Sequence, residues 1–234
     1  MIRESETLDS GLALVRVLQL ASPALPIGAY SYSQGLEAVV TEGLVRDERG
    51  ASRWIGEMLE GLIAPGEAAI LWRLLIVIQR ADWNACEAWN ARFRASRETA
   101  ELRAETEQMG SSLAKLALDL SLLDAQARAM LPRLAPITLP AAFALTACGF
   151  AVPATAALTA YLWSWLENQV LAAIKTVPLG QVAGQRLLTE LGARIPAAAA
   201  LARTIGDDDL NTFAPGLALA SCRHETQYTR LFRS

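Results

Sequence analysis

Apolar residues recur at intervals of three and four positions along most of the chain, a spacing that places them on one face of an α-helix. Leu12, Val15 and Leu18 follow this spacing, as do apolar positions within residues 54–62. The run LLIVI at 74–78 could form a strand, but helix-forming residues flank it on both sides, so we interpret it as helical. No segment alternates apolar and polar residues convincingly. The sequence therefore predicts an all-α protein.

Proline residues divide this pattern into a bundle of about ten helices. Proline suits the first turn of a helix, where its missing N–H costs little. Apolar runs follow several prolines, which we interpret as helix starts: Pro65, Pro140, Pro153, Pro178 and Pro196. Residues 21–30 hold further prolines and a glycine, and they must form a loop.

Two long segments need separate interpretation. Residues 97–120 predict a highly charged helix on which Arg97 faces Glu101, four positions away. Residues 134–166 carry no charged residue and are long enough to span a bilayer. Prolines interrupt them, so we predict two buried helices broken near Pro153 and no membrane span.

The chain divides into a helical body and a polar end. We interpret residues 1–206 as a single helical-bundle domain, because neither a repeat nor a break in composition splits them. Residues 207–216 combine acidic residues with proline and glycine, which predicts a flexible link. Residues 217–234 end in a basic stretch and are predicted to be a flexible tail that docks on a partner.

Composition narrows the class of protein. Hydrophobic residues make up 53% of the 234 residues and charged residues 19%, a balance typical of a folded core and not of disorder. The net charge of −3 argues against nucleic acid as a partner. The three cysteines are odd in number and far apart, and the N-terminus lacks a secretory signal, which indicates a cytoplasmic protein.

The residue patterns in the sequence give little support for an enzyme. Ser31 and Ser33 lie in a glycine- and serine-containing loop, but Ser31 occupies the position where a nucleophile elbow needs glycine. A phosphate-binding GxxxxGK[ST] motif is absent. His224, the single histidine, has only Cys222 nearby, too few ligands for a stable metal site within one chain. We predict a non-catalytic protein without a stably bound cofactor, and a metal site shared across a dimer remains an alternative.

Two segments have the character of interaction surfaces. The loop 21–30 leads into a helix on which Tyr30, Gln34 and Glu37 lie near one side; a core-packed turn is the alternative. In the tail, Tyr228, Leu231 and Phe232 have the i, i+3, i+4 spacing of an amphipathic anchor, with several arginines around them. Such residue types anchor interfaces, although the tail could also pack on its own domain.

Four segments in this order together resemble the UreF family of urease accessory proteins: LQLASPALPIGAYSYSQGLE (18–37), SRETAELRAETEQMG (96–110), AAIKTVPLGQ (172–181) and RHETQYTRLFRS (223–234). The chain length also fits this family. Residues 113–153 and 206–216 carry no motif that we can match. The resemblance implies an all-helical, dimerising protein in a cytoplasmic complex with UreD, also called UreH, and the GTPase UreG. That complex delivers nickel to apo-urease, so nickel and GTP would act through the partners.

The resemblance also implies roles for individual residues. The face toward UreG is associated with Glu37 and Lys175, and Tyr30 and Gln34 join it by their spacing. The terminal block implies a UreD-binding segment formed by Arg223, His224, Glu225, Tyr228, Arg230, Leu231, Phe232 and Arg233. The expected function is a scaffold that influences GTP hydrolysis by UreG without catalysis of its own. A nickel-binding chaperone with a site shared across a dimer is the alternative, against which the few His and Cys residues argue.

Overall fold

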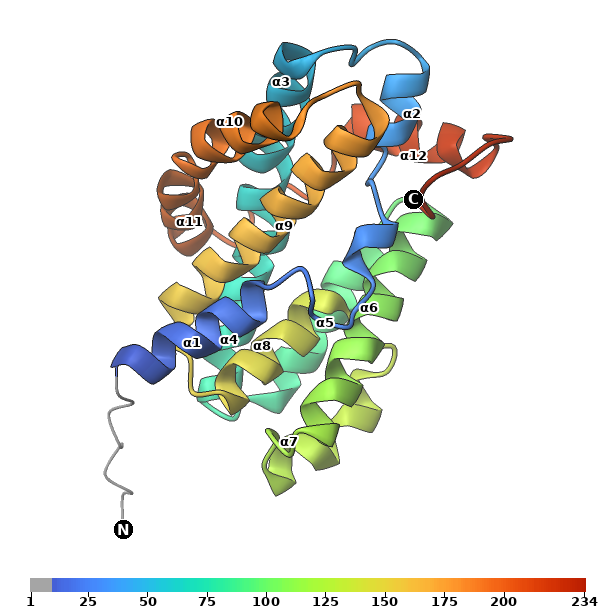
Figure 1. The fold of residues 1–234 in the computed structure, drawn as a ribbon. Coiled ribbons are helices and arrows are strands. Elements are labelled where there is room, and N and C mark those ends of the chain that lie inside the picture. Colours follow the sequence, from blue (N-terminus) through green and yellow to red (C-terminus); the bar gives the residue numbers. More distant parts are fainter. Residues whose placement is uncertain (1–9) are drawn as a thin grey trace.

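The computed structural model describes residues 10–234, which form a bundle of helices without a strand (Figure 1). Its elements are α1 (Ser10–Ala21), η1 (Ala29–Ser31), α2 (Leu36–Thr41), α3 (Glu48–Met58), η2 (Leu59–Ala68), α4 (Ala69–Gln79), α5 (Trp83–Ala95), α6 (Ala100–Asp119), α7 (Ala125–Met130), η3 (Leu131–Leu134), α8 (Leu139–Gly149), α9 (Ala154–Thr176), α10 (Gln181–Gly192), α11 (Ile195–Thr204) and α12 (Pro215–Glu225). The prediction of an all-α single domain is confirmed.

Local sequence explains most helix starts. Side chains cap four helices by accepting a hydrogen bond from a backbone N–H three positions on: Asp47 for α3, Asp82 for α5, Thr99 for α6 and Asp124 for α7. Proline occupies the first turn of α8, α11 and α12. Because Thr99 caps α6, Arg97 lies before the helix and pairs with Glu67 instead of Glu101.

Two expected helix starts are wrong. Pro178 precedes α10, which begins only at Gln181. Pro65 lies inside a continuous helical run, in the π-helical segment η2. A π-helix places its hydrogen bonds between residues five apart, a rare geometry common at functional sites, and apolar periodicity does not reveal it. The side chain of Glu67, on this segment, is buried.

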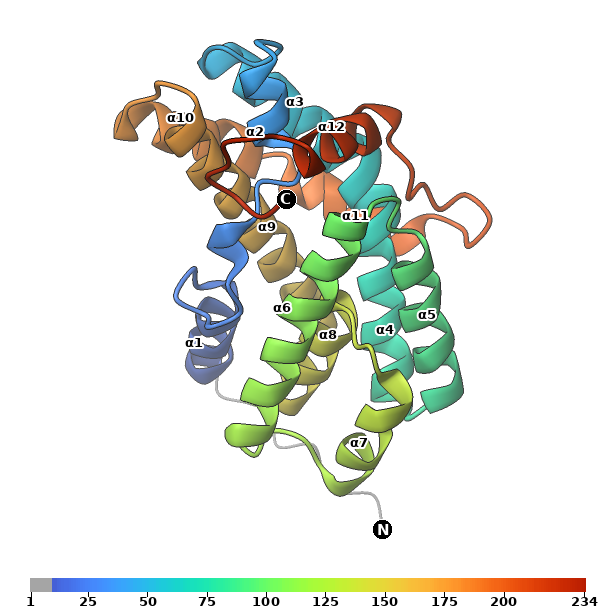
Figure 2. The ribbon, with the colours of Figure 1, turned by 90° about the vertical axis from the view of Figure 1, so that its right-hand side faces the viewer.

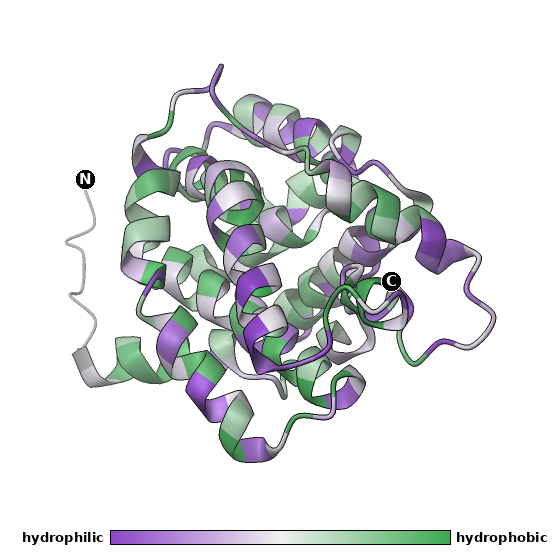
Figure 3. Ribbon diagram, turned by 90° about the horizontal axis from the view of Figure 1, so that it is seen from above, coloured by the Kyte–Doolittle hydropathy of each residue, from purple (hydrophilic) through white to green (hydrophobic). Residues whose placement is uncertain are grey.

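The core surrounds α8 and α9. The helix α9 packs against α1, α2, α10 and α11, while α8 packs against α4 and α6 (Figures 1 and 2). Pro153 caps α9 and separates it from α8, and both helices contribute many buried residues. The interpretation of 134–166 as two buried helices is confirmed. Most helices carry both apolar and hydrophilic positions along their length (Figure 3).

One long apolar run stands out among the described residues. The continuous helical stretch Glu48–Gln79 is long and apolar enough to cross a membrane, and 72% of its most apolar window is buried inside the fold. Burial to this extent is typical of the core helix of a globular protein, so the run is weak evidence for a membrane span.

The expected flexible link is held by side chains of the body. Arg73 forms an ion pair with Asp207 at 2.6 Å and donates to the Ile205 carbonyl at 2.7 Å. The Asn211 backbone N–H donates to the Pro65 carbonyl, and the Asn211 side-chain amide donates to the Gly61 carbonyl. The helix α12 also begins at Pro215, inside the segment 207–216, so the boundary expected after residue 216 is wrong.

The packing of α6 predicts a stability effect. A Cβ at Gly110 would lie 2.3 Å from the Ile137 carbonyl oxygen, a backbone atom that cannot move aside easily. We expect Gly110→Ala to lower the free energy of unfolding by about 1–3 kcal/mol, as overpacking does. Gly61→Ala is the matched control, because a Cβ there meets nothing within 4 Å. Denaturant unfolding monitored by circular dichroism measures both, and equal stability of the two variants would contradict the prediction.

Candidate functional site

The C-terminal segment, residues 226–234, folds back onto the start of the chain. The Arg233 N–H donates to the Ser31 carbonyl at 2.8 Å. The Ser33 N–H and hydroxyl both donate to the Ser234 carbonyl oxygen, at 2.8 and 2.6 Å. Phe232 is only 5% exposed and joins the main core. The segment therefore has internal partners, contrary to the expected flexible tail.

Glu37 is the acceptor that holds this segment. It lies in the first turn of α2 and is 5% exposed. One carboxylate oxygen accepts from the Leu231 N–H at 2.7 Å, and the other accepts from the Phe232 N–H at 3.0 Å. Burying a carboxylate is unfavourable unless such donors compensate it. The expectation that Glu37 lies on an exposed surface is wrong, because the chain's own C-terminal segment covers it.

Gly35 allows α12 to lie against the start of α2. Its φ of 77° is in the left-handed region that favours glycine. A Cβ at Gly35 would also approach the Leu217 and Ala220 side chains of α12 to 3.0 and 3.1 Å. The SQG sequence before α2 thus fits a position that needs both an unusual backbone angle and a missing side chain.

His224 lies fully buried between two carboxylates. Its Nε2 is 3.2 Å from a Glu37 carboxylate oxygen, and its Nδ1 is 2.8 Å from Glu101. Arg230 completes the cluster with an ion pair to Glu101 at 2.5 Å. Both ring nitrogens can donate to carboxylates only in the imidazolium form. The histidine expected in the docking tail therefore links α12 to α2 and α6.

Gln34 and Glu105 form a second connection beneath the C-terminal segment. The Gln34 amide donates to one Glu105 oxygen at 2.7 Å, and the Ser234 hydroxyl donates to the other at 2.6 Å. The indole N–H of Trp165 on α9 donates in turn to the side-chain amide oxygen of Gln34 at 2.7 Å. Burial raises the pKa of Glu105 to about 7. Gln34 thus connects the segment before α2 with α6 and α9. Of the two alternatives for this turn, packing against the core describes Gln34 better than an exposed interaction face does.

A small cavity of about 90 Å³ lies under the loop 21–30. Glu105, Glu67 and Tyr161 are among its polar lining residues. The Tyr161 hydroxyl donates to Glu67, which also lies 3.5 Å from Arg97. Glu67 and Glu105 already accept hydrogen bonds from protein donors. Within residues 10–234, no group of three His, Cys, Asp or Glu residues could hold a metal ion.

The remaining expected site residues lie at the surface. Lys175 is exposed in the last turn of α9, and its Nζ is 5.5 Å from the centre of the Phe232 ring. Tyr30, Tyr228 and Leu231 are exposed large apolar side chains. Arg223 pairs with Glu42 at 2.6 Å, and Glu225 accepts from the Glu101 N–H at 3.3 Å.

Sequence reasoning missed several residues of this cluster. Ser33, Glu101 and Glu105 all contact residues 224–234, and Ser234 lies at the end of this stretch, yet none of the four was named as a partner-binding residue. Glu101 and Glu105 lie in the matched block 96–110, and their spacing of four places both on one face of α6. This spacing is the feature of the sequence that could have identified the two carboxylates as neighbours in one site.

Comparison with known proteins gives consistent matches. The family model named UreF matches residues 45–192. The chain is 54% identical over 222 residues to the urease accessory protein UreF of Janthinobacterium sp. (strain Marseille), covering 95% of this chain and 98% of that protein. It is 54% identical over 228 residues to the urease accessory protein UreF of Azoarcus sp. (strain BH72), and the match covers 95% of this chain and 96% of that protein. A bifunctional urease accessory protein UreEF of Bordetella bronchiseptica is 54% identical over 232 residues, which cover 97% of this chain and 53% of that protein.

The position of Glu37 predicts that removing its carboxylate releases the C-terminal segment. In Glu37→Ala the Leu231 and Phe232 N–H groups lose their acceptor, so their amide hydrogen exchange should accelerate at least tenfold relative to the parent. Glu57→Ala is the control, because Glu57 is exposed. Unchanged exchange at these two amides in Glu37→Ala would show that other contacts hold the segment.

Glu105 predicts a dependence of stability on pH. Its ordinary pKa of 4.5 rises to about 7 in the fold, so between these values the folded state keeps a proton that the unfolded state has lost. The contribution of Glu105 is therefore full below pH 4.5 and is lost as the pH rises through 7. Glu105→Gln, which stays neutral, should show a smaller fall in the free energy of unfolding between pH 5 and 8. Urea unfolding across this range measures the slope, with Glu107→Gln on the same helix as control; parallel slopes for Glu105→Gln and the parent would refute the prediction.

Proposed function

The chain belongs to the UreF family of urease accessory proteins, and we propose that it is a non-catalytic scaffold that joins UreD (UreH) to the GTPase UreG. In this role it supports GTP-dependent insertion of nickel into apo-urease and biases GTP hydrolysis by UreG. Nickel and GTP act through the partners, so the chain itself needs no stable cofactor. We place this function in the cytoplasm and in a homodimer.

The convergence of four distant segments supports this proposal. Ser33 and Glu37 come from the first block, Glu105 from the second, Lys175 from the third and Phe232 from the last, and all of them lie around the C-terminal segment. The buried members hold the fold, while Lys175, Tyr228 and Leu231 stay exposed. An exposed surface built on a rigid internal network suits a docking protein.

Two residues of types used in nucleophilic catalysis are engaged in structural contacts, which supports a non-catalytic role. Ser33 donates its hydroxyl proton to the Ser234 carbonyl. His224, the single histidine, contacts Glu37 and Glu101 with both ring nitrogens. A scaffold needs only a surface that binds one nucleotide state of the GTPase better than another. The UreEF relative, in which a sequence similar to this chain forms about half of a longer accessory protein, supports joint action with other accessory proteins.

Exposed apolar residues outside the C-terminal segment support a homodimer. Leu14, Val15 and Leu18 project from α1 with more than half of their surface exposed. An adjoining groove includes Leu18, Trp163 and Ile195. Contiguous exposed apolar residues commonly mark protein interfaces, and we assign this one to a second copy of the chain.

Co-purification tests the scaffold directly. A tagged copy of the chain, expressed with the urease operon, should retain both UreD and UreG, and urease activity should depend on its presence. If neither protein is retained and urease is active without the chain, the proposed function is wrong.

The tail geometry predicts which residues contact UreD. Tyr228 is fully exposed and Leu231 is 70% exposed, whereas Phe232 is buried in the fold. Tyr228→Ala and Leu231→Ala should keep the parent's thermal midpoint and weaken UreD binding, by about thirtyfold where truncation costs ~2 kcal/mol. Phe232→Ala should lower the midpoint as well, because Phe232 is buried in the core. Calorimetric titration with UreD, with Leu201→Ala on α11 as control, would contradict this assignment if all variants bind equally.

A further inference from the structure

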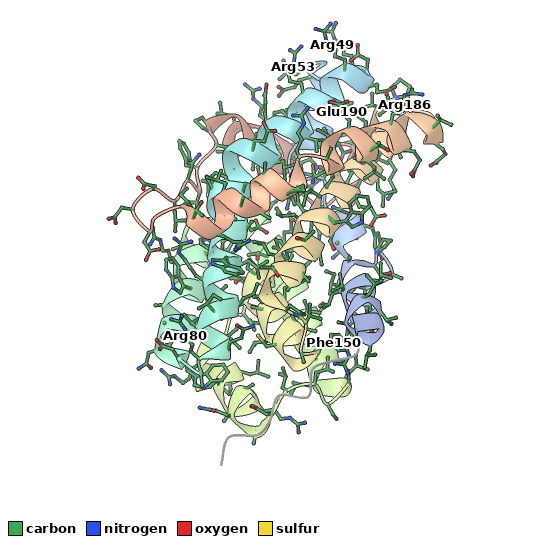
Figure 4. All side chains as sticks on the ribbon, turned by 90° about the vertical axis from the view of Figure 1, so that its left-hand side faces the viewer. Arg49, Arg53, Arg80, Phe150, Arg186 and Glu190 are labelled. Carbon is green, nitrogen blue, oxygen red and sulfur yellow. The ribbon has the colours of Figure 1, made fainter. Side chains whose placement is uncertain are left out.

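A group of exposed arginines lies at the end of the molecule where α3 and α10 meet. Arg49 and Arg53, on α3, project from this end into solvent (Figure 4). Arg46, in the loop just before α3, is exposed as well, and its Nε donates to the Gly43 carbonyl at 2.5 Å. We call this surface the arginine end; it consists of Leu44, Arg46, Arg49, Arg53 and Val182.

Arg49 and Arg53 have no partner within the fold. Among residues 10–234, neither side chain forms an ion pair or a hydrogen bond. The two arginines are four positions apart, so they lie on the same face of α3, and like charges at this spacing destabilise a helix. The stability of α3 therefore does not explain why both positions carry a positive charge.

The carboxylates of this region leave the arginines largely uncompensated. Glu48 accepts from Arg186 on α10 with both of its oxygens, at 2.8 and 2.6 Å. Asp47 caps α3 by accepting a hydrogen bond from a backbone N–H. Glu57 is exposed and four positions after Arg53, so it can offset only one of the three cations. A positive surface therefore remains, in a chain whose net charge is −3.

Further polar contacts fix α3 against α10 below this surface. One turn along from the ion pair just described, the Ser52 hydroxyl donates to Glu190 at 2.8 Å. Beyond that contact, Arg194 pairs with Glu60 at 3.3 Å. The arginine end is thus carried by two helices that are held together, and a surface of fixed elements loses less conformational freedom on binding than a mobile loop does.

Exposed apolar side chains accompany the arginines. Leu44 is 69% exposed and Val182 is 68% exposed. The Glu48–Arg186 ion pair aligns α3 with α10. Leu44 precedes this pair by four positions in the sequence before α3, and Val182 precedes it by one turn of α10, so both lie at the same end. Arginine is enriched at protein interfaces, and it pairs with carboxylates in a bidentate geometry that adds specificity.

We propose that the arginine end docks on an acidic patch of apo-urease, the client of the scaffold. In this contact Arg46, Arg49 and Arg53 face carboxylates, and Leu44 and Val182 pack beside them. The inference rests on the proposed scaffold function, and it gives the client a surface that is separate from the C-terminal segment.

An electrostatic contact suits the way in which such a client binds. A maturation factor must release its client after each round, so a contact that forms quickly and does not hold tightly is favourable. Exposed charges behave in this way, because they raise the rate and the specificity of association more than the affinity. The C-terminal segment and the apolar face of α1 are assigned to other partners, whereas the arginine end remains available to the client.

Charge reversal combined with salt dependence tests the proposal. The complex of this chain with UreD and UreG is immobilised, and apo-urease is titrated at low and high NaCl. The parent's affinity should fall with salt, because attraction between exposed charges is screened. Arg49→Glu with Arg53→Glu should weaken apo-urease binding by about tenfold at low salt and remove most of the salt dependence. Leu44→Ser with Val182→Ser should weaken binding by about threefold and leave the salt dependence intact.

Arg80→Glu with Lys115→Glu is the matched control. Both residues are exposed and form no ion pair within residues 10–234, and Arg80 lies toward the opposite end of the molecule from Arg49 (Figure 4). All variants should retain UreD and UreG as the parent does.

Three results would overturn the docking assignment while the scaffold stands. The first is a parent complex that does not bind apo-urease, and the second is an arginine-end charge variant that binds it within twofold of the parent. The third is a control variant that loses as much affinity as the arginine-end variant. If the parent chain retains neither UreD nor UreG, the proposed function itself is overturned.

Discussion

The buried carboxylate of Glu37 and the backbone N–H groups of residues 231 and 232 depend on each other. A carboxylate removed from water needs hydrogen-bond donors, and a non-helical backbone packed against a protein needs acceptors for its N–H groups. Glu37 meets both needs at once, although it lies 194 positions before Leu231 in the sequence. Because Phe232 is held by the same contact, the C-terminal segment has a fixed place, and the positions of its exposed side chains follow from that place.

This contact also determines which side chains of the C-terminal segment are exposed and which are buried. Residues 231 to 233 point in alternating directions: Leu231 is exposed, Phe232 is buried and Arg233 is exposed. Such alternation is the geometry of an extended chain and not of a helix. The i, i+3, i+4 spacing that suggested an amphipathic anchor therefore does not apply after α12 ends at Glu225. Tyr228 and Leu231 remain available to a partner, while Phe232 serves the fold.

Local rules predict much of this fold and little of its site. Proline at a first turn, the break at Pro153 and the all-α class follow from short-range chemistry that the sequence displays. Pro65 and Pro178 show the limit, since neither a π-helical turn nor the exact start of α10 is fixed by a proline alone. The sequence blocks around Glu37 and Lys175 can be recognised locally, but the burial of Glu37 depends on a segment almost two hundred residues away. Periodicity describes one element at a time, so it cannot show which distant backbone covers a carboxylate.

The internal network also constrains how a partner can act on this protein. A partner that draws the C-terminal segment away would leave Glu37 without two backbone donors and Ser33 without its acceptor. Stranding a buried charged group costs more than the roughly 1–3 kcal/mol of a neutral one. Such a partner must supply new donors or admit water to the site. Binding to the exposed side chains of the docked segment meets no such cost, which favours recognition of Tyr228 and Leu231 in place.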